Sequence, residues 1–70
     1  MAALLLPIQQ ALALRDASAA ALLAHDLAPC AEGRPPFEAA LVRELAKALE
    51  AADWIRVDLW VALLMRWGWR

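Results

Sequence analysis

The chain has 70 residues and a mass of 7.7 kDa, a length that supports one domain and argues against a second hydrophobic core. Seven basic residues against eight acidic ones give a net charge of −1, which argues against nucleic acid as a partner. Ala and Leu supply 32 of the 45 apolar residues, whereas Val and Ile total five and Tyr is absent. This composition predicts an all-α fold, a small bundle of three to four short helices.

Neither end of the chain has the pattern of a targeting or membrane-spanning segment. The N-terminal apolar stretch lacks a preceding basic residue and contains Pro7, Gln9 and Gln10, unlike a secretory signal. The longest uncharged run near the C-terminus covers residues 59–65, whereas a bilayer span needs about 20 apolar residues. The single cysteine, Cys30, cannot form an internal disulfide, so we expect a cytoplasmic protein.

Two helices are expected before the first loop, at about residues 7–15 and 18–27. Pro7 suits the first position of a helix, and Asp16 or Ser18 suits the cap of a second one. The sequence alone leaves open whether the two helices are continuous. One apolar face at helical spacing comprises Ile8, Leu12, Ala19, Leu23 and Leu27.

A loop rich in Pro and Gly follows at residues 29–36, and a third helix is predicted for residues 36–52. Its charged residues lie away from an apolar stripe at steps of three and four residues, the spacing of one buried helix face. The stripe comprises Phe37, Leu41, Leu45, Ala48, Leu49 and Ala52.

The last predicted helix, residues 54–67, is rich in tryptophan, with Asp53 as its cap and Gly68 as its stop. One apolar row contains Trp54, Val57, Val61 and Leu64, and a second, rotated row contains Trp60, Leu63, Leu64 and Trp67. A helix that is apolar nearly all round must be buried on more than one side. We therefore expect it to be half core and half contact surface, with a core of Leu41, Leu45, Leu49, Trp54 and Trp60.

No catalytic, cofactor or metal site is predicted. His25 and Asp26 match the dipeptide of metal-binding phosphohydrolases, but the chain has no other histidine to complete such a site. Cys30 has no acid to orient His25 as a base, and Gly33 and Gly68 are too isolated to cradle a phosphate. The sequence thus predicts neither an enzyme nor a small-molecule binder.

The end of the chain is the predicted contact surface. Tryptophan and arginine are over-represented among interface hot spots, and Trp69 lies beyond the helix stop. We expect a protein partner, with a second copy of the chain first, to contact Trp60, Leu63, Leu64, Trp67, Trp69 and Arg70. A membrane surface is the second candidate partner, with Trp60, Trp67 and Trp69 as anchors and Arg66 and Arg70 outward.

The order of these features is similar to a known family. A Leu-x-x-Pro start, an Ala-Leu-Leu helix, a Gly-Pro turn and a closing Leu-Glu-x-x-Asp-Trp phrase follow one another up to residue 57. In this order the chain resembles the C-terminal helical tail of bacterial HDOD-type output domains, especially those joined to EAL domains in cyclic-di-GMP signalling proteins. The resemblance implies a non-hydrolytic regulatory module and supplies no catalytic residue. The matching residues are Pro7, Leu22, Leu23, Gly33 with Pro35 or Pro36, Leu49, Glu50, Asp53 and Trp54.

Overall fold

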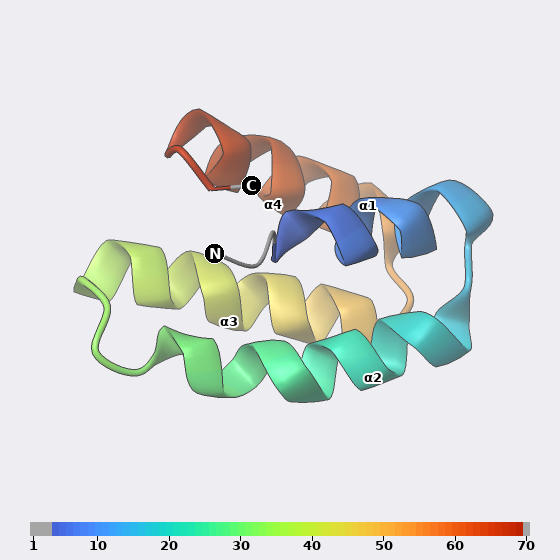
Figure 1. Cartoon of the computed structure of the whole chain (residues 1–70), viewed down its shortest axis with the longest axis horizontal. Coiled ribbons are helices and arrows are strands. Elements are labelled where there is room, and N and C mark those ends of the chain that lie inside the picture. Colours follow the sequence, from blue (N-terminus) through green and yellow to red (C-terminus); the bar gives the residue numbers. More distant parts are fainter. Residues whose placement is uncertain (1–3, 70) are drawn as a thin grey trace.

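The computed structural model describes residues 4–69, and this part of the chain contains four α-helices, one 3₁₀ helix and no strand (Figure 1). The predicted all-α fold is confirmed. The elements are α1 (Leu5–Leu14), α2 (Ala17–Leu27), the 3₁₀ helix η1 (Ala28–Ala31), α3 (Pro36–Glu50) and α4 (Trp54–Arg66).

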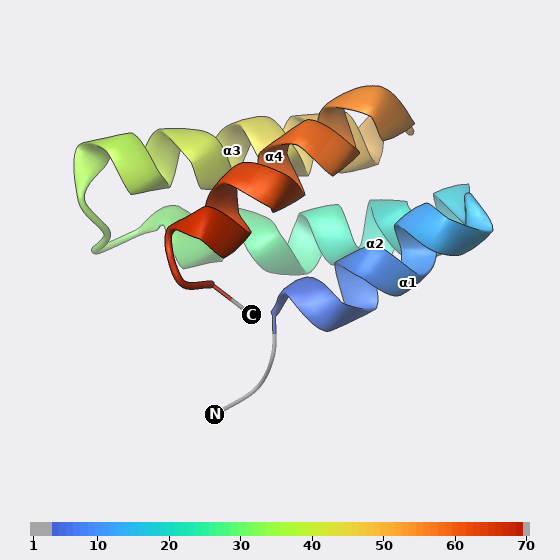
Figure 2. The same cartoon turned by 90° about the horizontal axis from the view of Figure 1, so that it is seen from above.

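The four α-helices pack in a closed ring. α2 and α3 run antiparallel side by side, α1 packs against α2, and α4 packs against both α3 and α1. Seen from above, α4 crosses over α3 at an angle and its C-terminal end approaches the start of α1 (Figure 2). Each helix therefore packs against two other α-helices, and the side that faces away from both of them meets solvent.

The corner between α1 and α2 is a Schellman turn closed by an aspartate. Arg15 takes a left-handed conformation with φ of 52°, and the Asp16 N–H donates to the Ala11 carbonyl over 3.0 Å. The Asp16 carboxylate then accepts a hydrogen bond from the Ala19 N–H at 3.1 Å and caps α2. The continuity that the sequence left open is thus decided: the first two helices are separate, and Asp16, one of the two candidate caps, is the cap.

The corner between α3 and α4 repeats this geometry. Ala52 is left-handed with φ of 54°, and the Asp53 N–H donates to the Ala48 carbonyl over 2.9 Å. The Asp53 carboxylate accepts from the Arg56 N–H at 3.3 Å, so the predicted cap is confirmed. Because Ala52 has left the helical conformation, α3 ends at Glu50 and not at residue 52.

The start of α1 differs from the prediction. The helix begins at Leu5, two residues before the expected start at Pro7. Pro7 is thus the third helical residue, within the first turn, where an N–H has no partner in the helix in any case. The proline therefore costs the helix no hydrogen bond.

The core runs through the centre of the ring. Leu41, Leu45 and Leu49 are buried as predicted, but Trp54 and Trp60 are only half-buried. The prediction of both tryptophans as core residues is corrected: they pack against the edge of the core and cover it. The largest fully buried side chains are Leu5, Ile8, Val42, Leu45, Leu49, Val57 and Leu64.

Two members of the predicted α3 stripe lie outside the core. Phe37 is 60% exposed and Ala52 is half-buried. A row of residues four apart turns by about 40° at each step, so Phe37, two steps before Leu45, has rotated about 80° from it. The structure buries Val42 on the other side of the stripe instead.

α2 turns its alanines to the core. Ala20, Ala24 and Leu27 are buried, whereas Ala19 and Leu23 of the predicted face are half-buried. The sequence pattern favoured the larger side chains, but a short side chain lets two helix backbones approach closely, as at the α2–α3 contact. The buried face of α2 is therefore rotated by one residue from the predicted one.

Candidate interaction surface

α4 has a continuous exposed face, which we call the outer α4 face. Val57, Val61 and Leu64 point into the core. On the opposite side Ile55 is 84% exposed, and Leu59 is 52% exposed. At 100° per residue these exposed positions share one side of the helix. The outer α4 face comprises Ile55, Asp58, Leu59, Ala62, Met65 and Arg66, all exposed.

The charged residues of this face form no ion pair with the described part of their own chain. Within residues 4–69 neither Asp58 nor Arg66 takes part in an ion pair. Arg56, which lies beside the face, is held instead by Asp53 at 3.3 Å at the start of the helix. The outer α4 face thus presents Leu59 and Met65 between an anion and a cation that form no ion pair within the described residues, with Ile55 on the far side of the anion.

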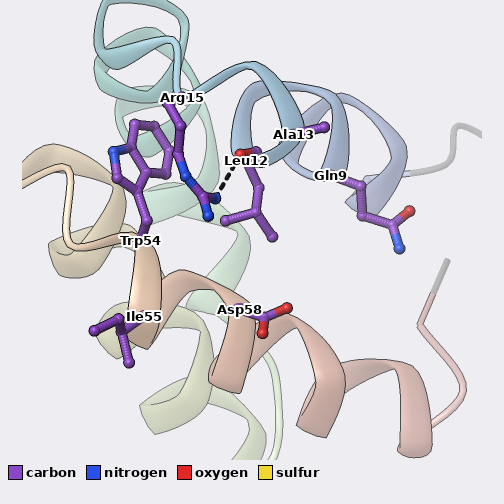
Figure 3. A pocket seen from close by; sticks show the side chains of 7 residues that line it. All are labelled: Gln9, Leu12, Ala13, Arg15, Trp54, Ile55 and Asp58. Atoms are coloured by element: carbon purple, nitrogen blue, oxygen red, sulfur yellow. Dashed lines mark hydrogen bonds between the residues drawn. The ribbon is translucent and has the colours of Figure 1, made fainter.

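A groove between α1 and α4 continues the surface on one side (Figure 3). Its volume is about 470 Å³, and in the close-up it opens to solvent. The Arg15 guanidinium lies over the Trp54 ring at 5.8 Å and donates to the Leu12 carbonyl at 2.7 Å. Arg15 is thus held in the wall of the groove by its contacts with Trp54 and Leu12. The lining of the groove comprises Gln9, Leu12, Ala13, Arg15, Trp54, Ile55 and Asp58.

The residues predicted to contact a partner differ in how far the structure exposes them. Leu64 is fully buried, and its assignment to the contact surface is corrected: it points into the core together with Val57 and Val61. Trp60 and Leu63 are half-buried at the edge of the core, whereas Trp67 is 56% exposed. Arg70 lies outside the described residues.

Trp67 makes an aromatic contact with α3. Its ring lies 5.1 Å from the ring of Phe37, tilted by 32°. Both rings remain more than half exposed, so the pair forms an apolar patch at the end of α4. Among the predicted contact residues that the structure describes, Trp67 is the most exposed.

Trp69 folds back onto its own chain. Gly68 is left-handed with φ of 99°, and the Trp69 N–H donates to the Leu64 carbonyl over 3.0 Å, a third Schellman turn. This turn directs the indole to α3, where its N–H donates to the Glu38 carboxylate. The Arg34 guanidinium lies over the indole ring at 4.2 Å. Trp69 therefore finds its partners within the molecule, which corrects the expectation that it reaches into a neighbour.

The half-buried Trp60 stabilises the fold through its packing and not through a hydrogen bond to a described residue. Its indole nitrogen is buried, and no described residue accepts a hydrogen bond from it. A buried N–H without an acceptor costs about 1–3 kcal/mol. The ring must offset this cost by its apolar contacts with the core, so Trp60 has a structural role in the folded chain.

The residues considered for catalysis form no group that could hold a metal ion within the described part of the chain. His25 is exposed on α2, and the Cys30 thiol donates to the Asp26 carbonyl at 3.7 Å. Between residues 4 and 69, no three His, Cys, Asp or Glu side chains lie close enough to hold a metal ion. A second groove, about 490 Å³ in volume, lies between α2 and α3 over alanines, with His25, Arg43 and Lys47 in its lining.

Sequence reasoning missed Ile55, Leu59 and Met65 as surface residues. Ile55, Leu59 and Ala62 follow the same helical spacing as the buried row, so periodicity alone does not tell which row faces the core. To tell the two rows apart, the positions of α1 and α3 are needed, because these helices cover the row that contains Val57 and Val61.

No helix within the described part of the chain combines the length and apolar character that crossing a membrane requires. Comparisons with models of protein families, with curated proteins and with solved structures found no match to this chain. The resemblance to HDOD-type tails therefore stays a prediction from the sequence.

Proposed function

We propose that this chain is a non-enzymatic helical protein-interaction module that self-associates, with the outer α4 face as its contact surface. The observation that supports this most strongly is the exposure of Ile55, Leu59 and Met65 on one helix face. Monomeric proteins expose single apolar side chains commonly, but a row of them along a helix is typical of a contact site.

A second copy of the chain is the partner that the observations favour. The net charge of −1 leaves almost no repulsion between copies. A standard interface covers about 800 Å² of each partner, roughly one sixth of the 4698 Å² that this chain exposes. A chain of this length also gains more from association than a larger domain, because its own core is small.

The likeness to HDOD-type tails suggests where such a module acts. A helical, non-hydrolytic output element of bacterial signalling works by contact and not by catalysis, which agrees with a regulatory role in the cytoplasm. This setting is part of the proposal and rests on the sequence resemblance alone.

The test is the mass of the chain in solution. Light scattering or sedimentation at micromolar concentration is expected to give a mass above 7.7 kDa. Leu59→Asp is expected to reduce the species to a monomer, because it places a charge in the middle of the apolar row. Leu22→Asp is the matched control, since Leu22 is equally a large exposed residue but lies on α2.

Two outcomes would contradict the proposal. A folded monomer at every concentration would exclude self-association. A monomer that sediments with phospholipid vesicles, and loses this binding in Leu59→Asp but not in Leu22→Asp, would identify a membrane surface as the partner instead.

A further inference from the structure

Five of the six residues of the outer α4 face, all except Ile55, are arranged symmetrically about Ala62. Asp58 lies four residues before Ala62 and Arg66 lies four residues after it. Leu59 and Met65 lie three residues before and three after. The face therefore carries opposite charges at equal distances from its centre, large apolar side chains at equal distances inside them, and the smallest side chain in the middle.

This order is complementary to itself when two helices run in opposite directions. In an antiparallel pair related by a twofold axis, each residue meets the one at the mirrored position of the other copy. Centred on Ala62, such a pair brings Asp58 level with the partner's Arg66 and Leu59 level with the partner's Met65. A parallel pair in register would instead set like charges side by side at both ends.

We infer that two copies of this chain associate through their outer α4 faces as an antiparallel pair, with the twofold axis at Ala62. The inference rests on the proposed self-association and gives it a geometry. The Ala62 methyl groups let the two helix axes approach to about 8–10 Å, the spacing at which neighbouring side chains interlock.

The two end contacts decide the orientation. Within the described residues Asp58 and Arg66 have no ion-pair partner, so both charges are available to the other copy. The twofold axis creates this contact twice, once at each end of the paired helices. Leu59 and the partner's Met65 pack between the charges and exclude water from the centre.

Charge reversal tests the orientation. Asp58→Arg alone and Arg66→Asp alone each turn two attractive contacts into two repulsive ones, and each is expected to raise the dimer Kd about tenfold or more. The double variant Asp58→Arg/Arg66→Asp restores both pairs and is expected to return to within about threefold of the original Kd. All three carry changes at exposed positions, and circular dichroism verifies that each is folded.

Mixing the two single variants gives a sharper result. One copy then carries two arginines and the other two aspartates, so a heterodimer is expected to form in preference to either homodimer. In a parallel pair the single variants would bind no more weakly than the original chain, because that arrangement already sets like charges together. Equal Kd values for all the variants would overturn the inference.

A cysteine at the twofold axis tests its position. In a Cys30→Ala background, Ala62→Cys is expected to form a disulfide-linked dimer under mild oxidation, because residue 62 faces its own copy. Ile55→Cys is the control: seven residues from the centre, its two copies lie about 21 Å apart, too far for a disulfide. Cross-linking at residue 55 and not at 62 would exclude the arrangement.

The outcomes separate the two levels of the proposal. A chain that is monomeric throughout refutes the proposed function and this inference together. A chain that dimerises, but responds neither to charge reversal nor to the cysteine at residue 62, keeps the proposed function and refutes the antiparallel geometry.

Discussion

α3 and α4 differ in how they use their apolar residues. α3 buries seven residues from Ala39 to Leu49 and turns its charges outward. α4 is only two residues shorter and carries more large apolar side chains, yet it buries three: Val57, Val61 and Leu64. The more apolar of the two helices thus contributes fewer residues to the core.

The position of each helix in the ring explains the difference. α3 packs against α2, η1 and α4, so neighbours cover a wide part of its surface. α4 packs against α3 and α1 only, and the short α1 leaves the far side of α4 uncovered. The number of residues that a helix buries therefore depends on its neighbours and not on its own hydrophobicity. The apolar residues of α4 that its neighbours do not bury remain available for contact with another molecule.

The same substitution on the two helices gives the largest expected contrast. Leu45→Ala removes a fully buried side chain and is expected to lower the free energy of unfolding by about 2–5 kcal/mol. Leu59→Ala is expected to cost less than about 0.5 kcal/mol, because that side chain is exposed in the single chain. Urea denaturation at submicromolar concentration, followed by circular dichroism, measures both.

The comparison would be contradicted if Leu45→Ala and Leu59→Ala lowered the free energy of unfolding by the same amount. A large effect at Leu59 in dilute solution would mean that α4 buries its outer face within one chain. An effect that grows with protein concentration would instead follow from association, because a dimer is stabilised by mass action.

The two tryptophans after α4 give an intermediate contrast. Trp69→Ala is expected to cost about 2 kcal/mol, since it removes the hydrogen bond to Glu38, the contact with Arg34 and part of the core cover. Trp67→Ala removes an exposed ring and is expected to cost below about 1 kcal/mol. Thermal or urea unfolding ranks the two variants, and the reverse order would show that Trp69 does not fold back onto α3.

Substitutions in the turn between α3 and α4 are expected to change the free energy of unfolding the least. Ala52 is left-handed, a conformation that suits glycine better than alanine, so Ala52→Gly is expected to stabilise the chain by about 0.5–1 kcal/mol. Ala51→Gly is the matched control: at φ of −82° the alanine is unstrained, and the change is expected to destabilise by about as much. Two variants of equal stability would contradict the geometry of the turn.

Much of the fold could be predicted from local sequence signals. The loop at Pro35 and Pro36, the Asp53 cap and the Gly68 stop act on backbone groups within a few residues, so they work wherever the helix lies. The burial of Leu45 and Leu49 follows equally from the spacing of α3, whose charged residues leave only one apolar side.

The contact surface could be predicted only in part. The sequence indicated that α4 is more apolar than one core contact requires, but the predicted set placed Leu64 on the surface and left out Ile55 and Leu59. Trp69 shows the same limit, because its partners Arg34 and Glu38 lie more than 30 residues away along the chain.

Local signals in the sequence located the Asp53 cap and the Gly68 stop, because capping and helical spacing are interactions between residues that are close along the chain. The start of α1 and the end of α3 each lie two residues from the predicted position. The apolar row of α4 that is covered is selected by the packing of the other helices. That choice depends on where α1 and α3 lie, and their contacts with α4 join residues far apart in the sequence. The residues that stay exposed between Ile55 and Met65 form the surface on which the proposed association rests.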